Sequence, residues 1–321
     1  MQLLVYDDLK PEMEASRAAT HLGAFGGFLS PSEVAIWRRL GSFSDYVGVF
    51  AVEAGQVLGH AYALRLPYTY PDGRVERVSG VAGVGSRPDH RGRGLARRML
   101  EEIHRRERKE GIDHIALWTN RSWGAHGIYE RLGYQDVYGI PLAVRAVPRT
   151  MRPASNTVRV RHGRVTDLPR LEEVHVRATR GRIGFTPRLP RSLVAEHKAR
   201  ALDPPKDLLV ATDGGRPVGY ARVEEDPSRV RCPELLTEGP GAALALIEAM
   251  ERRGRGRMCT WCLSAVADQG AELRRRGYLF VPTGWYGMMA CRLRGEANAS
   301  QVRAELGVDQ PRWVVHRGDQ F

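Results

Sequence analysis

The sequence lacks a long run of apolar residues. No apolar stretch reaches the roughly 18 residues that a membrane-spanning helix needs, so we expect no membrane span. The first ten residues, MQLLVYDDLK, also lack a basic segment followed by an apolar core, which is the pattern of a secretory signal peptide. Both absences favour a soluble protein of the cytoplasm.

Cysteine is scarce and unevenly placed. The 321 residues include four cysteines, and all of them fall in the second half of the chain: Cys232, Cys259, Cys262 and Cys291. Cys259 and Cys262 form a C-x-x-C pattern, which can bind zinc or act in thiol–disulfide exchange. Because this pair lies inside an apolar strand pattern, we interpret the thiols as buried core residues and expect no metal.

Acidic residues are outnumbered by basic ones, with 37 Asp and Glu against 49 Lys and Arg and a formal net charge of +12. Such an excess suits an anionic cofactor or nucleic acid. The basic residues are spread along the chain, and the densest run, 104–110, falls on the polar side of a predicted helix. We interpret this run as a solvated helix face and favour that over a nucleic-acid surface.

The most informative stretch is 78–96. Residues 78–84, VSGVAGV, form an apolar run typical of a buried strand, and Pro88 ends the strand because proline cannot donate to a ladder. The segment RGRGLA at 91–96 then opens a helical pattern, with apolar residues at helical spacing up to Gly111. The stretch therefore predicts a strand, a glycine-containing turn and a helix.

A helix start of this composition can bind phosphate, because its first N–H groups are unpaired and carry the positive end of the helix dipole. Gly92 and Gly94 would let the backbone approach an anion, and Arg91 and Arg93 would add charge. The lysine and hydroxyl of a P-loop are missing, and no G-x-G-x-x-G follows a first strand. The alternative interpretation is an arginine-rich turn that caps a surface helix.

A second motif follows at 120–134, NRSWGAHGIYERLGY. With R-x-x-G-x-A at 91–96, it resembles motifs A and B of the GNAT superfamily of acyl-CoA N-acyltransferases, and the two motifs are most similar to the Eis-like branch. Four residues match the motif B form N-x-x-A-x-x-x-Y-x-x-x-G-[FY]: Ala125, Tyr129, Gly133 and Tyr134. Asn120 stands two positions early, and Ser122 occupies the usual asparagine position.

The resemblance implies a site for acetyl-CoA as co-substrate. It assigns the pantetheine arm to three residues of the motif strand: Val84, Gly85 and Ser86. It assigns the pyrophosphate to the turn and helix start: Arg91, Gly92, Arg93, Gly94, Leu95, Ala96 and Arg97. Two residues of the second motif would complete the cofactor site: Asn120 and Ala125.

The resemblance also implies catalytic groups. Acetyl transfer from a thioester to an amine needs an oxyanion site, which backbone N–H groups near Val84 would supply, and an acid for the leaving thiolate. Tyr129 is the expected acid, because a phenol with a pKa of about 10 is protonated at neutral pH. The base stays open between Glu76, His60, the C-terminal carboxylate of Phe321 and a chain of water molecules.

The second half of the sequence repeats the first. VATDGG at 210–215 echoes FAVEAG at 50–55, and RRGY at 275–278 echoes RLGY at 131–134. The second copy has no R-x-x-G-x-A. We predict an α/β protein of two tandem GNAT folds, each a mixed, mostly antiparallel sheet flanked by helices. The predicted parts are a catalytic domain at 1–145, a linker at 146–157, a degenerate domain at 158–293 and a tail at 294–321.

The expected function is direct transfer of acetyl from acetyl-CoA to a primary amine of a small molecule. In GNAT folds the region before residue 40 helps to wall the acceptor site, and a later loop lies near it. The candidate acceptor contacts are therefore Phe25, Phe28, Trp37, Tyr68 and Tyr70. Two alternatives stay open: acetylation of a protein N-terminus or lysine, and a non-catalytic module that binds acyl-CoA or nucleic acid.

Overall fold

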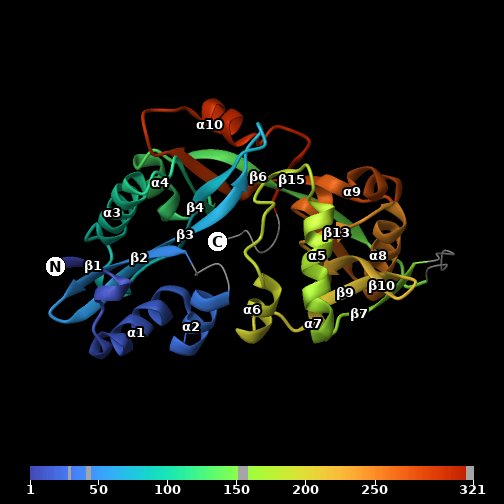
Figure 1. Cartoon of the computed structure of the whole chain (residues 1–321), viewed down its shortest axis with the longest axis horizontal. Coiled ribbons are helices and arrows are strands. Elements are labelled where there is room, and N and C mark those ends of the chain that lie inside the picture. Colours follow the sequence, from blue (N-terminus) through green and yellow to red (C-terminus); the bar gives the residue numbers. More distant parts are fainter. Residues whose placement is uncertain (28–29, 41–44, 151–157, 316–321) are drawn as a thin grey trace.

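The computed structural model describes residues 1–27, 30–40, 45–150 and 158–315 (Figure 1). No helix within these ranges is long and apolar enough to cross a membrane. The first copy of the repeat contains β1 (Gln2–Val5), α1 (Glu14–Phe25), α2 (Pro31–Leu40), β2 (Tyr46–Glu53), β3 (Gln56–Thr69), β4 (Val75–Ser86), α3 (Leu95–Lys109), β5 (His114–Asn120), α4 (Gly124–Arg131) and β6 (Gln135–Ala146).

The second copy and the C-terminal segment follow. They contain β7 (Arg159–His162), α5 (Leu168–Ala178), β8 (Ile183–Gly184), α6 (Ser192–Lys198), α7 (Pro204–Asp207), β9 (Leu208–Asp213), β10 (Arg216–Arg222), β11 (Glu224–Glu225), β12 (Arg229–Cys232), β13 (Leu235–Thr237), α8 (Pro240–Arg253), β14 (Met258–Cys262), α9 (Ser264–Arg275), β15 (Leu279–Arg292), α10 (Ala299–Leu306) and β16 (Trp313–Val314). Short 3₁₀ turns occur at Tyr6–Asp8, Pro11–Met13, Pro88–His90 and Val165–Asp167.

The hydrophobic pattern explains the elements around the first motif. β4 ends at Ser86, a 3₁₀ turn follows at Pro88–His90, and α3 begins directly after Gly94. One face of α3 is buried, and its apolar members recur at helical spacing: Leu95, Met99, Leu100 and Ile103. The predicted order of strand, glycine-containing turn and helix is therefore confirmed.

One large sheet extends through both copies. Its strand order is β1-β2-β3-β4-β5-β15-β6-β14-β12-β11. Along this path the β4–β5 and β12–β14 pairs are parallel, and the other pairs are antiparallel. The predicted mixed, mostly antiparallel sheet with flanking helices is thus confirmed.

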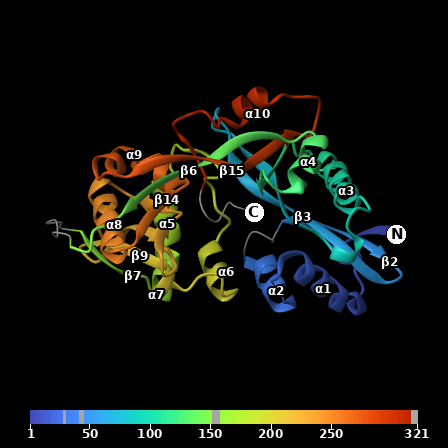
Figure 2. The same cartoon turned by 180° about the vertical axis from the view of Figure 1, so that it is seen from behind.

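The two copies exchange strands in the middle of this sheet. β15 of the second copy lies between β5 and β6 of the first, with Tyr286 opposite Asn120 at one end. β6 in turn continues into the second copy and pairs with β14. Both views show β6 and β15 reaching across the molecule (Figures 1 and 2). The division at 146–157, of which 151–157 lie outside the described residues, stays a proposal, and the large sheet continues across it.

The second copy also has a small sheet of its own, in the order β13-β10-β9-β7. α5 packs on one face of it and α8 on the other. The hairpin of β9 and β10 corresponds to that of β2 and β3, as the repeat predicts. The counterpart of β4 is split, because β12 pairs with β14 in the large sheet whereas β13 pairs with β10 in the small one.

The C-terminal segment is packed against the first copy. α10 ends before Gly307, which has the left-handed φ of +70° that the predicted helix end requires. The Tyr68 hydroxyl donates to the carbonyl of Leu306 at 2.5 Å, and the Trp313 indole donates to the Tyr68 hydroxyl at 2.8 Å. Tyr68 and Tyr70 are each 1% exposed. The prediction that these two tyrosines contact an acceptor is therefore wrong, because they form core beneath α10.

Candidate functional site

Strands β4 and β5 separate near the middle of the large sheet. Their parallel pairing ends at Val81 opposite Leu117, although β4 continues to Ser86 and β5 to Asn120. Gly83 has a φ of +56°, and the register between β3 and β4 shifts at this point, which marks a β-bulge. Within the described residues no strand pairs with β4 on this side beyond the separation, so its edge is available to a ligand.

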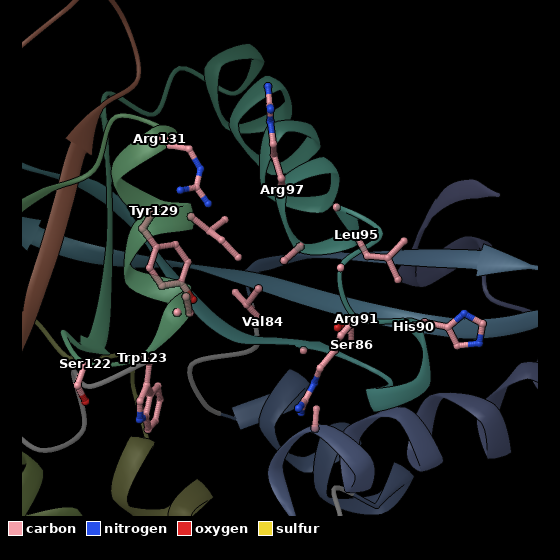
Figure 3. A pocket seen from close by; sticks show the side chains of 18 residues that line it. Val84, Ser86, His90, Arg91, Leu95, Arg97, Ser122, Trp123, Tyr129 and Arg131 are labelled. Carbon is pink, nitrogen blue, oxygen red and sulfur yellow. The ribbon is translucent and has the colours of Figure 1, made fainter.

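A cavity of about 1060 Å³ opens beside the separated strands. It extends from the turn before α3 to α4 (Figure 3). Most of the predicted site residues line it: Val84, Gly85, Ser86, Arg91, Gly92, Gly94, Leu95, Ala96, Arg97, Ala125 and Tyr129. The fold thus brings the two sequence motifs to a single site.

The turn before α3 forms the end of the cavity that suits an anion. Gly92 and Gly94 have φ values of +78° and +72°, and no heavy atom lies within 4 Å of a Cβ built at either position. Gly94 is the N-cap of α3 and provides no side chain to pair with the first N–H groups of the helix. Arg91 and Arg97 also line this end and add positive charge.

Two predicted cofactor residues lie elsewhere. The Arg93 guanidinium donates to Glu53 Oε1 at 2.9 Å and does not line the cavity. Asn120 Oδ1 accepts from the backbone N–H of Ser122 at 2.9 Å and from its hydroxyl at 2.7 Å. Asn120 therefore holds the loop after β5, and Ser122 lines the cavity in its place. The structure gives Arg93 a partner on β2 instead of the predicted anion.

Tyr129 lines the other end of the cavity, on α4, and Figure 3 shows its ring beside Val84. The Tyr129 side chain is 8% exposed, and burial raises the pKa of its phenol to about 12. Its ring packs edge-on against Tyr134, with centroids 5.8 Å apart. A phenol with such a pKa stays protonated at neutral pH and can donate a proton to a leaving thiolate.

The predicted bases are not brought to Tyr129. Glu76 is exposed on β4 and pairs with Arg74 at 3.0 Å. At ~3.3 Å per residue, Glu76 lies about 26 Å along the strand from Val84. The prediction that Glu76 is the base is therefore not supported, because its position is too far along the strand. Phe321 lies outside the described residues.

His60 is buried away from the cavity. Its side chain is 0% exposed and stacks on His21, with ring centroids 5.2 Å apart, while Phe25 lies 5.9 Å away. Burial lowers the pKa of His60 to about 3, so the ring is neutral. Of the other candidate acceptor contacts, Phe28 and the Trp37 side chain lie outside the described parts of the structure.

Sequence reasoning missed several residues of the cavity wall. They are Ala24, His90, Ser122, Trp123, Gly124, Ile128 and Arg131. Gly124, Ile128 and Arg131 recur at helical spacing, which places them on one face of α4 and could have identified them. Arg131 matters most, because it supplies a further cation to a site that already contains Arg91 and Arg97.

Comparison with known proteins assigns the first copy to a domain family. The acetyltransferase (GNAT) domain family matches residues 7–137. The chain contains a GNAT acetyltransferase domain. Over 113 residues it is 34% identical to the N-acetyltransferase Eis of Mycobacterium tuberculosis (strain ATCC 25177 / H37Ra), a match that covers 35% of this chain and 27% of that protein. The chain thus matches about a quarter of the length of these curated relatives, and the GNAT domain is Eis-like.

Solved structures show that the same architecture extends over the rest of the chain. A probable N-acyltransferase from Enterococcus faecalis V583 superposes with a TM-score of 0.68 at 14% identity, covering 91% of this chain and 73% of that one. Eis1 from Mycobacterium abscessus gives 0.60 at 17% identity, covering 91% and 74%. A tandem GNAT protein from the clavulanic acid biosynthesis pathway gives 0.53 at 14% identity, covering 92% and 100%. These matches confirm the tandem GNAT fold.

The cysteines lie outside the GNAT domain's cavity. All four are free and buried, as interpreted from the sequence. Burial raises the pKa of the Cys259 thiol to about 11 and that of Cys291 to about 12. Among the described residues, no group of three or more His, Cys, Asp or Glu side chains could hold a metal ion. The thiols therefore lie in the core, where Cys232 Sγ donates to the carbonyl of Glu234 at 3.3 Å and Cys262 Sγ accepts from Arg231 at 3.2 Å.

Proposed function

We propose that the chain is an acetyl-CoA-dependent N-acetyltransferase that transfers acetyl directly to a primary amine of a small molecule. The supporting observation is one cavity that contains a cationic glycine turn at one end and Tyr129 at the other, with the free edge of β4 between them. These groups suit, in order, a diphosphate, an extended pantetheine arm and a leaving thiolate. Acetyl-CoA of the cytoplasm would supply the acetyl group.

The proposed reaction uses the backbone and one side chain. The amine nitrogen attacks the thioester carbon, and backbone N–H groups of β4 near Val84 stabilise the oxyanion that forms. The C–S bond then breaks, and the sulfur takes the Tyr129 proton. The attacking nitrogen loses its proton to water, and solvent restores the tyrosine proton. The products are the N-acetylated amine and CoA with a free thiol.

The second copy supports a single active site. Glu238 stands immediately before Gly239 and α8, where the first copy has its cationic turn. Its carboxylate accepts from Arg177 at 2.9 Å and from Arg216 at 3.0 Å. A carboxylate of the chain itself at this helix start disfavours a second diphosphate there. We therefore propose that 158–293 has the fold without its own cofactor site.

Calorimetric titration with CoA, followed by thiol-release assays with a panel of amines, tests the proposal. One CoA should bind per chain, and a Gly94→Glu variant should not bind it, because a carboxylate would face the diphosphate. Small amines should then stimulate thiol release from acetyl-CoA. Binding without turnover of any amine would indicate a non-catalytic module, and turnover of peptides alone would indicate a protein acetyltransferase.

A further inference from the structure

A second, smaller cavity of about 400 Å³ adjoins the first. Trp123, in the loop between β5 and α4, lines both cavities. The other walls come from both copies, with Asn120 at the end of β5, Arg231 on β12, and Trp285 and Tyr286 on β15. Trp123 lines both cavities and stands beside Gly124 and Ala125, which line the larger one together with Tyr129. A molecule in the smaller cavity would therefore lie next to the Tyr129 end of the larger one.

The smaller cavity is lined by aromatic rings that internal contacts hold in place. Tyr286 stacks on Trp118 with centroids 6.1 Å apart and an interplanar angle of 17°, and Trp285 lies 5.7 Å from Tyr286. Trp123 and Trp285 are nevertheless 61% and 57% exposed. Large rings left in water around a concave site are typical of ligand binding, because a flat ligand would cover them.

The wall contains a charged side chain that belongs to an ion pair. Among the described lining residues Arg231 is the charged group, and no carboxylate lines the cavity. The Arg231 guanidinium donates to Glu224 Oε2 at 2.7 Å and to Cys262 Sγ at 3.2 Å, which fixes its position. The Arg231 guanidinium lines the cavity although Glu224 pairs with it, so an anionic substituent would meet an ordered donor there. A polycation would find only a carboxylate that is already paired.

We propose that this cavity is the acceptor site and that its substrates are arylalkyl primary amines. The ring lies against Trp285 and Tyr286, an acidic substituent where present meets Arg231, and the amine extends past Trp123 to the thioester. The inference rests on the proposed acetyltransferase function and adds the substrate class. The nitrogen forms its bond to the acetyl carbon as the C–S bond breaks, with the proton transfers given above.

Initial rates at saturating acetyl-CoA test the inference with three probes: tryptamine, tryptophan and spermidine. Tryptamine and tryptophan should be acetylated with a kcat/KM at least tenfold above that of spermidine. Trp285→Ala should raise the KM for tryptamine roughly tenfold with little change in kcat, and Trp285→Phe should restore most of the loss because it keeps a ring. Arg231→Met should lower the ratio of kcat/KM for tryptophan to kcat/KM for tryptamine. A general loss of folded protein would leave this ratio unchanged.

Leu279→Ala is the matched control, since Leu279 lies on the same strand, is 71% exposed and is outside the cavity. This variant should retain wild-type KM values. Faster turnover of spermidine than of tryptamine, or a tryptamine KM unchanged in Trp285→Ala, would overturn the inference while leaving the acetyltransferase function intact. Absence of turnover with every amine, despite acetyl-CoA binding, would overturn both.

Discussion

Replacing Gly94 by alanine separates its effect on backbone conformation from its proposed role in binding the diphosphate. Its φ of +72° is unfavourable for any residue with a Cβ, yet no atom lies within 4 Å of where the Cβ would stand. The change should therefore cost only the backbone strain, about 1–2 kcal/mol of the free energy of unfolding. Gly277, which follows the C-cap Arg276 of α9, has a φ of +80° and similarly open surroundings, so Gly277→Ala should cost the same.

The two variants should differ in CoA binding. The Gly94 Cβ would enter the cavity at the start of α3, where a diphosphate would meet the backbone N–H groups. Losing one hydrogen bond to a charged group costs about 1.5–3 kcal/mol, which raises the Kd for CoA by roughly tenfold to a hundredfold. Gly277 lies outside the cavity, so Gly277→Ala should keep the wild-type Kd.

Calorimetric titration with CoA and thermal unfolding of the free proteins measure the two effects. The melting temperatures of Gly94→Ala and Gly277→Ala should fall alike, whereas only the former should lose CoA affinity. Pantetheine, which lacks the diphosphate, should not distinguish the variants. Equal CoA affinities for both variants would refute the assignment of the glycine turn to the diphosphate.

Four other variants probe three separate parts of the molecule. Arg91→Ala should weaken CoA binding about tenfold and reduce the salt dependence of the Kd. Arg93→Ala should leave the Kd nearly unchanged, because Arg93 pairs with Glu53 and does not line the cavity. Titrations with CoA at two ionic strengths distinguish the two variants. Tyr129→Phe should lower kcat by about 10²–10⁴ at unchanged CoA affinity. Because the Tyr129 pKa is raised to about 12, the wild-type kcat should show no alkaline decline below about pH 10, and a decline there would exclude this acid. Arg65→Met should lower the free energy of unfolding by about 3–5 kcal/mol, measured in urea, because Glu107 is 0% exposed and loses its cation.

Local sequence patterns were sufficient to predict most of the residues that line the larger cavity. The apolar run of β4, the following glycine turn and the apolar face of α3 are contiguous, so periodicity and turn chemistry predict them together. The second motif placed Ala125 and Tyr129 on one helix, and both line the cavity. Arg93 could not be excluded in this way, because its partner Glu53 lies on a different strand, 40 residues earlier.

Long-range packing explains what the sequence did not show. Spacing along one strand could already have placed Glu76 far from Val84, because each residue of a strand adds ~3.3 Å. The aromatic character of Tyr68 is equally compatible with a binding site and a core, and only the docking of α10 decides between them. The exchange of β6 and β15 leaves no local signal, because each strand keeps the same pattern whichever copy it joins.

The strand exchange gives the second copy a role although it lacks a cofactor turn. β15 supplies the antiparallel neighbour of β5, so within the described residues the sheet beside the larger cavity is completed by a strand of the second copy. The same strand carries Trp285 and Tyr286, and β12 carries Arg231, all of which line the smaller cavity. Absence of a glycine turn from the second copy is therefore compatible with retention of its fold, because the first copy needs its strands and the proposed acceptor site uses its side chains.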